Sequence, residues 1–186
     1  MSTDNSVSTW TIDPTHAEVA FAVRHLMLAT VRGRFGTVSG TIELNEAAPA
    51  KSTVDVTVDI ASIDTRQEMR DNHLRSADFF DVANHPTLHF VSTRVEGDIT
   101  GEFRLIGDLT IRGTTKEVTL NVSLQGRGRD PWGNERAGFE ATGKLNRKDF
   151  GLTWNQALET GGVAVGDEVK LSIDVEIVRQ VAAAAA

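Results

Sequence analysis

The chain of 186 residues contains no cysteine and no tyrosine, and it has only four prolines. The absence of cysteine excludes disulfides, thiolate catalysis and zinc sites built on sulfur. Acidic residues outnumber basic residues, 26 to 19, so that the formal net charge is -7. A negative protein repels phosphate backbones, and no nucleic-acid partner is expected. No apolar run approaches the roughly 20 residues that a helix needs to cross a bilayer, so no integral membrane segment is expected.

The two ends of the chain lack targeting patterns. Residues 1–9 are polar, include Asp4 and carry neither the basic flank nor the apolar stretch of a secretory signal. We therefore expect a flexible N-terminus over 1–9, a flexible tail over 180–186 and, if residue 1 is the natural start, a cytoplasmic protein. A chain trimmed of a leader would instead be periplasmic or secreted. With 40% hydrophobic and 24% charged residues, the segment 10–179 is expected to form one globular domain.

Apolar side chains alternate with polar ones along most of the chain, most clearly in residues 53–63, 116–127 and 168–178. Alternation with a period of two places the apolar side chains on one face of a strand. About eight long strands are expected, and apolar residues recur every three or four positions only in one short helical segment near residues 66–80. Because closure removes exposed strand edges, we predict an all-β, eight-stranded antiparallel, lipocalin-like barrel.

Local signals predict several irregular features. Pro14 is expected to bend the chain before a strand over 16–25, and Gly36 indicates a β-bulge inside a strand over 35–44. The segment 64–85 is long for a connection, and long connections often form lids or binding loops. The loop-rich segment 148–166 carries Phe150 and Trp154, which are expected either to guard the barrel opening or to plug the barrel end.

A barrel of this size is about wide enough to enclose one small ligand. The inward rows of side chains are then the candidate ligand contacts. Each methylene buried there contributes roughly 0.8 kcal/mol, which favours a chain-like apolar guest. The alternative, a lumen packed solid by these side chains, stays open. The candidates are Val19, Phe21, Val23, Phe90, Phe103, Leu105, Leu120, Val122, Phe139, Leu171 and Ile173, with Met69 from the helical segment and Trp154 from the later loop.

Two histidines are candidates for contacting a polar head group. His25 is the one polar member of an apolar row. It either lies at a pocket mouth or is a buried histidine bonded to a backbone carbonyl. His73 lies on the apolar face of the helical segment, where it either orients the ligand or joins the helix to the barrel. Arg70 and Asp71 beside it are expected to form a local ion pair.

Motifs for catalysis or metal binding are missing from the sequence. Asp13 and His16 invite a metal or acid–base role, but Asp13 precedes Pro14 and is expected to cap the turn. His85 and His89 would lie about 13 Å apart in a strand, too far to share a metal. The sequence has neither a Gly-x-Ser-x-Gly elbow nor a Gly-rich phosphate loop. We predict no catalytic residue, no metal site and no cofactor.

An ordered series of short motifs resembles the YceI-like family along residues 10–178. The motifs are WTIDPTH at 10–16, FAVRHL at 21–26, GRFG at 33–36, RDNHL at 70–74, DFFD at 78–81, HPT at 85–87, FVST at 90–93, GDLTIRG at 107–113 and RKDFG at 147–151. The chain departs from the family pattern at Ala17, where serine is common, and at His85, where an aromatic residue is common. These departures bear on the head-group end of the pocket.

The resemblance implies a lipocalin-like barrel that holds a polyisoprenoid, an isoprenoid quinone or another long amphiphile non-covalently. It also implies a possible homodimer and no established catalysis. The leading hypothesis is therefore non-catalytic binding of a small hydrophobic or amphiphilic ligand for transport, storage or sequestration. The alternatives are a lipid-modifying enzyme that uses His25 or His73 as acid and base, and a filled barrel that serves as a protein-interaction module.

Overall fold

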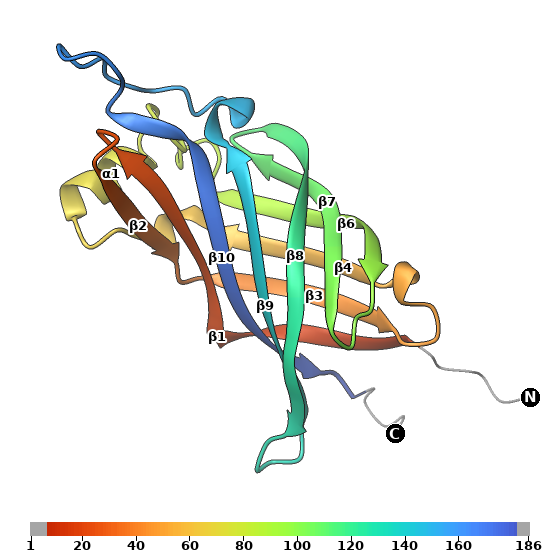
Figure 1. Ribbon diagram of the computed structural model, residues 1–186. Helices are drawn as coiled ribbons and strands as arrows, with labels where there is room; N and C mark the ends of the chain where they lie inside the picture. The colour runs from red at the N-terminus through yellow and green to blue at the C-terminus, as the bar shows by residue number, and fades with distance from the viewer. Residues whose placement is uncertain (1–6, 182–186) are drawn as a thin grey trace, which may run out of the picture.

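The computed structural model describes residues 7–181 (Figure 1). They form one antiparallel sheet system, one α-helix and three short 3-10 turns. The helix α1 spans Glu68–Arg75, and the turns are η1 Pro49–Lys51, η2 Ile60–Ser62 and η3 Arg147–Phe150. The strands are β1 Val7–His25, β2 Ala29–Phe35, β3 Val38–Asn45, β4 Thr53–Asp59, β5 Ile63–Asp64, β6 Thr87–Gly97, β7 Glu102–Ile111, β8 Thr114–Arg129, β9 Glu135–Asn146 and β10 Val165–Arg179.

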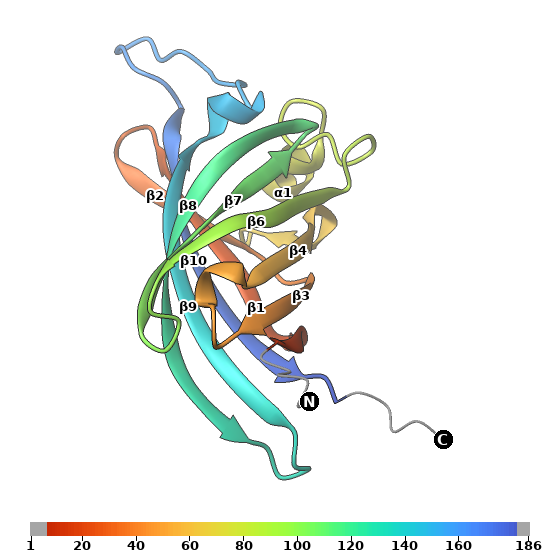
Figure 2. The ribbon, with the colours of Figure 1, turned by 90° about the vertical axis from the view of Figure 1, so that its right-hand side faces the viewer.

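Eight of these strands close into a barrel, which confirms the predicted fold class. The ring runs β1-β3-β4-β6-β7-β8-β9-β10 and is closed by antiparallel pairing of β10 with β1. Most strands that are adjacent in the ring also follow one another in the sequence, because short connections reverse the chain between them. Figures 1 and 2 show the strands curving around a common axis, with the β8–β9 hairpin projecting at one end. Closure gives each of these eight strands a paired neighbour on both sides.

Strand β2 lies outside the ring and was not predicted. It pairs with the second half of β1, and the short β5 pairs with its far end. The segment expected to be one strand with a bulge at Gly36 is instead split, because Gly36 and Thr37 separate β2 from β3. Alternation is weak in β2, since Gly33 occupies an inward position without a side chain.

A kink after Ile12 lets the single 19-residue strand β1 serve two parts of the fold. Before the kink β1 pairs with β3, and beyond it β1 pairs with β2. Strand β10 pairs with β1 on both sides of the kink, from Trp10 to His25. The register with β10 shifts between Ile12 and Ala17, where the expected bend at Pro14 falls. Asp13 caps this turn as predicted, because its Oδ1 accepts from the Thr15 backbone N–H at 2.9 Å.

The ordered barrel extends beyond the predicted domain limits. Val7 to Thr9 pair with β3, so the part of the predicted flexible N-terminus that the structure describes is a strand. Gln180 donates from its backbone to the Thr9 carbonyl at 2.8 Å and from its side chain to the Thr11 hydroxyl at 2.7 Å. Residues 1–6 and 182–186 lie outside the described residues.

Helix α1 is shorter than the predicted segment 66–80. Arg66 has a left-handed φ of 63°, and Gln67 then caps the helix by accepting from the Met69 N–H at 2.9 Å. At the other end the Ser76 hydroxyl donates to the His73 carbonyl at 2.6 Å. Residues 77–86 continue as turns without regular structure. No helix within residues 7–181 is long and apolar enough to cross a membrane.

The expected ion pair between Arg70 and Asp71 is not formed. Both side chains bind Thr65 instead. Arg70 donates to the Thr65 hydroxyl and carbonyl, each at 2.7 Å, and the Thr65 hydroxyl and backbone N–H donate to the Asp71 carboxylate. Thr65 and Asp71 are both buried, so this network fixes the start of α1 against the end of β5.

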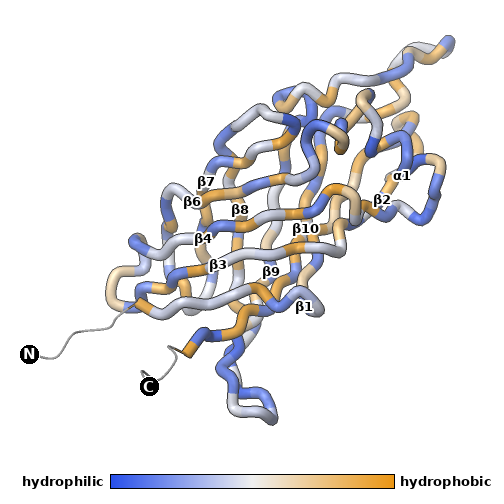
Figure 3. The backbone as a smooth tube through the Cα atoms, turned by 180° about the vertical axis from the view of Figure 1, so that it is seen from behind, coloured by the Kyte–Doolittle hydropathy of each residue, from blue (hydrophilic) through white to orange (hydrophobic). Residues whose placement is uncertain are grey.

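Hydrophobic residues alternate with polar ones along the strands, as the colours in Figure 3 show. The buried residues form two clusters. The larger joins β1, β3 and β4 to η3 and the segment after α1, and it includes Trp10, Ile60 and Phe150. The smaller lies among β6, β7, β8 and β9. Many inward side chains of β1 and β10 are only partly buried, which indicates that the barrel interior is not filled by them.

Candidate ligand cavity

A cavity of about 520 Å³ runs through the barrel. All eight ring strands contribute inward side chains to it, mostly at alternate positions. Along β10 every second residue from Val169 to Ile177 lines it, over eight residue steps or about 26 Å of strand, and Val165 at the start of β10 lines it too. The volume falls within the range of roughly 300–1,000 Å³ that is typical of small-molecule sites. The described barrel is therefore hollow, and a lumen packed solid by its own side chains does not describe it.

Nearly all the predicted contact residues line this cavity. They comprise Val19, Phe21, Val23, His25, His73, Phe90, Phe103, Leu105, Leu120, Val122, Phe139, Trp154, Leu171 and Ile173. Met69 is the exception, because its side chain is 79% exposed and lies outside the lining. Arg70, the next residue on α1, lines the cavity instead. That these side chains contact a ligand stays a prediction.

Polar lining residues are concentrated at one end of the cavity. Arg24, His25, Arg70, His73, Arg147 and Gln156 lie there, and Ser52 and Arg127 line the rest. No carboxylate belongs to the lining formed by residues 7–181. Three of the end residues are exposed, namely Arg24, His25 and Gln156, whereas Val95 and Ile99 at the far end are 6% and 4% exposed. The cavity thus has a polar, cationic mouth.

His25 lies at this mouth, at the end of β1. It pairs with Ala29 of β2 and Val165 of β10. Its side chain is exposed rather than buried, so the alternative of a core histidine is wrong. An imidazole in this position has access to both solvent and the lumen, which suits contact with a polar head group.

His73 both lines the cavity and joins three segments. Its ring packs edge-on against Phe79 and Trp154, with centroids 5.0 Å and 4.7 Å away, and Phe79 and Trp154 contact each other at 5.3 Å. Its Nε2 lies 2.8 Å from an Asp78 carboxylate oxygen. This cluster holds α1 and the later loop over the barrel end. The structural role expected for His73 is therefore present, together with access to the cavity.

The buried Arg147 anchors the loop that closes the same end. Its guanidinium donates to the carbonyls of Leu152, Trp154 and Gly166 at 2.6, 2.9 and 2.8 Å. Burial lowers the pKa of Arg147, and Asp167 at 3.7 Å opposes this shift. Most of its N–H groups are used by the backbone, so Arg147 holds the loop rather than awaiting a ligand. Phe150 beside it is 2% exposed and packs in the larger core cluster without lining the cavity, so it does not guard the opening.

Two glycines allow aromatic side chains to lie flat across neighbouring strands. A Cβ on Gly33 would be 2.4 Å from the Phe21 ring, and one on Gly107 would be 2.5 Å from the Phe90 ring. Both rings line the cavity. The glycines therefore shape the lumen although they contribute no side chain. A contact of this kind across strands has no local signal in the sequence.

Asp13 belongs to a polar network outside the cavity. Hydrogen bonds from Thr15, Arg136 and His16 hold the pKa of Asp13 below its usual value. Arg136 donates to Asp13 at 2.7 Å and also to Glu176. Ligand atoms of Asp13, His16 and Glu176 lie within 4.8 Å of one another, but the Arg136 guanidinium already supplies positive charge to both carboxylates. The network ties the β1 kink to β9 and β10, and it supports no metal site.

Several lining residues were not predicted. The alternating Val54, Val56 and Val58 of β4 were visible in the sequence and could have been chosen by the same rule. Arg70 and Gln156 had no such pattern, because they reach the cavity from the helix and a loop. Their places depend on how these segments fold over the barrel end.

A closed antiparallel barrel with an apolar lumen and a polar mouth defines a lipocalin-like binding fold. Residues 10–177 match the YceI-like domain, and the chain belongs to the YceI-like family. It is 44% identical over 165 residues to Protein YceI of Escherichia coli O157:H7, covering 89% of this chain and 83% of that protein.

Solved structures that share the fold include two at low sequence identity. Burkholderia cenocepacia BcnA superposes with a TM-score of 0.76 at 22% identity, covering 89% of this chain and 98% of BcnA. A polyisoprenoid binding domain from Saccharophagus degradans, implicated in plant cell wall breakdown, superposes with a TM-score of 0.65 at 15% identity, covering 92% of this chain and 98% of that domain. At these identities the likeness concerns the fold alone.

Proposed function

We propose that the protein binds a long-chain isoprenoid, an isoprenoid quinone or a similar amphiphilic lipid in the barrel and does not change it chemically. It would serve as a carrier, a store or a sequestering protein. The observation that carries this proposal is the cavity of about 520 Å³ with its almost wholly apolar lining. Burial of about 20 carbons would contribute on the order of 15 kcal/mol before the costs of association and ordering.

The shape and polarity of the cavity support an elongated guest with one polar end. The lining extends about 26 Å along β10 between Val169 and Ile177. Its polar residues gather at the mouth and include arginines and histidines but no carboxylate of the described chain. A neutral or anionic head group is therefore favoured there. The Saccharophagus degradans domain that shares this fold is itself described as polyisoprenoid binding.

A lumen-blocking variant with a matched control tests the proposal. Ala141 lines the cavity, whereas the next residue, Thr142, is exposed on the outer face of β9. The delipidated protein is titrated with a quinone or a prenol, and native mass spectrometry detects any lipid that co-purifies. Ala141→Trp is expected to weaken uptake at least tenfold, since an indole takes the place of ligand methylenes at about 0.8 kcal/mol each. Thr142→Trp should bind as the wild type does. Equal uptake by both variants, or none by the wild type, would refute lumen binding.

The same preparation separates binding from catalysis. His25 and His73 are the histidines of the lining, and imidazole is the side chain most often used for acid–base catalysis. For a binding protein, His25→Gln and His73→Gln should keep most of the affinity, and the extracted ligand should be chemically unchanged. Turnover that these substitutions abolish would show a lipid-modifying enzyme instead.

We also propose a homodimer, on the family resemblance alone. Light scattering on the purified protein should then give twice 20.2 kDa, or about 40 kDa. A mass near 20.2 kDa at all concentrations would refute it.

A further inference from the structure

The turn between β1 and β2 presents apolar side chains to solvent. It consists of Leu26, Met27 and Leu28, and the last two are 60% and 83% exposed. These exposed fractions are large for methionine and leucine, because folding usually buries such side chains. The inward residues of the rest of the β1–β2 hairpin are buried or partly buried, with Phe35 at 4% exposure. The exposed large apolar side chains of the hairpin are therefore confined to the tip.

The tip has a defined conformation. Leu26 donates its backbone N–H to the Ala164 carbonyl at 2.9 Å, and Leu28 donates to the His25 carbonyl at 3.0 Å. The Arg24 guanidinium donates to the Met27 carbonyl at 2.9 Å. Leu26 and Met27 have left-handed φ values of 52° and 57°, which are unfavourable for side chains of their size. The fold thus maintains a strained turn in order to display apolar side chains, a combination that is typical of functional positions.

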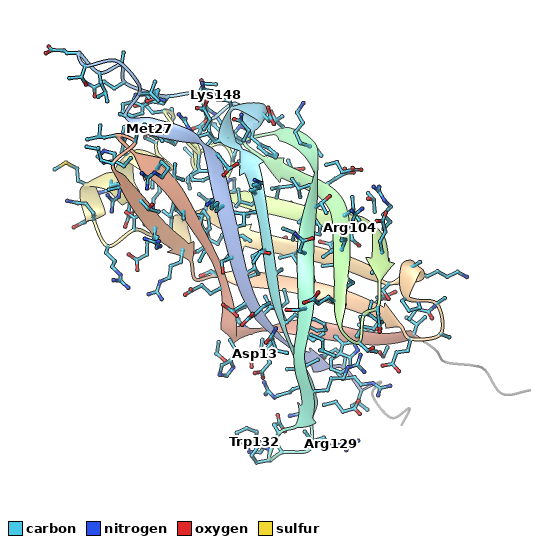
Figure 4. All side chains as sticks on the ribbon, in the orientation of Figure 1. Asp13, Met27, Arg104, Arg129, Trp132 and Lys148 are labelled. Carbon is cyan, nitrogen blue, oxygen red and sulfur yellow. The ribbon has the colours of Figure 1, made fainter. Side chains whose placement is uncertain are left out.

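This tip adjoins the mouth of the cavity. His25, which precedes the tip, lines the cavity, and so does Ala164, to which Leu26 is bonded. Figure 4 shows Met27 at the same end of the barrel as Lys148, and Trp132 at the opposite end. The exposed apolar residues therefore lie where a guest would pass in or out.

The hairpin around the tip is positively charged, although the chain carries -7 overall. Residues 22–35 include Arg24, Arg32 and Arg34 and no carboxylate. Arg34 is paired with Glu18 and Asp64. Arg24 and Arg32 form no ion pair with any carboxylate within residues 7–181. Two cations that lack a carboxylate partner among the described residues thus flank the apolar tip, although Arg24 also donates to the Met27 carbonyl.

We propose that this tip inserts into the surface of an anionic phospholipid bilayer, so that the cavity mouth faces the lipid. Exposed apolar side chains beside arginines that no described carboxylate neutralises have the composition of an interfacial membrane anchor, in which burial of apolar area and attraction to anionic lipid add together. The inference rests on the proposed function, because the proposed guests dissolve in bilayers rather than in water. A tip this small offers a protein partner little area compared with a stable interface.

A single fluorescent label tests insertion directly. Because the chain has no cysteine, Leu28→Cys provides a unique site for an NBD dye, and Trp132→Cys, at an 81% exposed position of the opposite end, provides the matched control. The probes are vesicles of phosphatidylcholine with about 30 mol % phosphatidylglycerol, and vesicles of phosphatidylcholine alone. The dye at position 28 should shift to the blue and be quenched by spin-labelled lipid in anionic vesicles. The dye at position 132 should not respond. No response at position 28, or an equal response at both, overturns the proposal.

A flotation assay on unlabelled variants then shows which side chains contribute to vesicle binding. Met27→Asn with Leu28→Ser removes the apolar surface, and asparagine tolerates the left-handed backbone at position 27. Its vesicle-bound fraction should fall at least tenfold, since two apolar side chains leave the interface. Arg32→Gln should weaken binding to anionic vesicles and reduce its dependence on salt. Trp132→Ser should bind as the wild type does, and undiminished binding by the double variant overturns the proposal.

These tests distinguish a failure of the membrane-anchor proposal from a failure of the proposed lipid binding in the lumen. Met27, Leu28 and Arg32 do not line the cavity. Uptake of a prenol from detergent solution, without vesicles, should therefore be unchanged in these variants. Normal uptake with no vesicle binding by the wild type would refute the membrane anchor alone, whereas failed uptake by the wild type would refute lumen binding.

Discussion

Two phenylalanines of the barrel should respond very differently to the same truncation. Phe150 in η3 is 2% exposed and packs into the larger core cluster. Phe139 on β9 lines the cavity and contacts Phe103 edge-on with centroids 6.2 Å apart. Phe→Ala removes the same atoms at both positions, so a difference between the two losses in the free energy of unfolding reports only the surroundings of each ring.

The expected costs follow from what each ring contacts. Phe150→Ala removes contacts on all sides and should lower the free energy of unfolding by about 3–5 kcal/mol. One side of the Phe139 ring borders the cavity, and atoms beside a void have fewer contacts to lose. Phe139→Ala should therefore cost about 1–2 kcal/mol, much of it from the pair with Phe103.

Urea unfolding of delipidated protein, followed by circular dichroism, measures both values. In a chain of this length 1 kcal/mol corresponds to about 2–4 °C in Tm, so thermal scans should separate the two variants. Addition of a prenol that binds in the cavity should raise the free energy of unfolding of the wild type more than that of the Phe139→Ala variant. If Phe139→Ala costs as much as Phe150→Ala without ligand, the interior is packed solid in solution and the reasoning from a hollow lumen fails.

Three further predictions concern the framework around the cavity. Gly107→Ala should cost about 1–3 kcal/mol in urea unfolding, because its Cβ would overlap a phenyl ring and a carbonyl at 2.5 Å, whereas Gly36→Ala, with nothing within 4 Å, should be neutral. Hydrogen bonds, Thr15 first, lower the pKa of Asp13, so its stabilisation is present above about pH 4 and is lost in acid. Asp13→Asn should show a shallower fall of stability below about pH 4, and an unchanged slope would contradict this role. Arg147→Met should speed proteolysis within 152–166, since buried carbonyls lose their donors, and resistance equal to wild type would contradict the anchor.

Strand periodicity predicted most of the barrel and its lining because it is a local property. Val19, Phe21 and Val23 alternate in sequence and all line the cavity. Helical periodicity was less reliable. It placed both Met69 and His73 toward the barrel, but only His73 lies there. An eight-residue helix has too few turns to define one apolar face, so its orientation is set by the bonds between Arg70 and Thr65.

The sequence by itself determined the class of fold, the strands that form the ring and the apolar character of their inner face. These follow from a period of two and from turn residues, which act over a few positions. Only the tertiary structure decided that the interior is hollow, that cationic residues gather at one end and that an apolar tip stands beside them. Each of these depends on the distance between segments remote in sequence, such as β1 and β10, and no local pattern encodes such a distance.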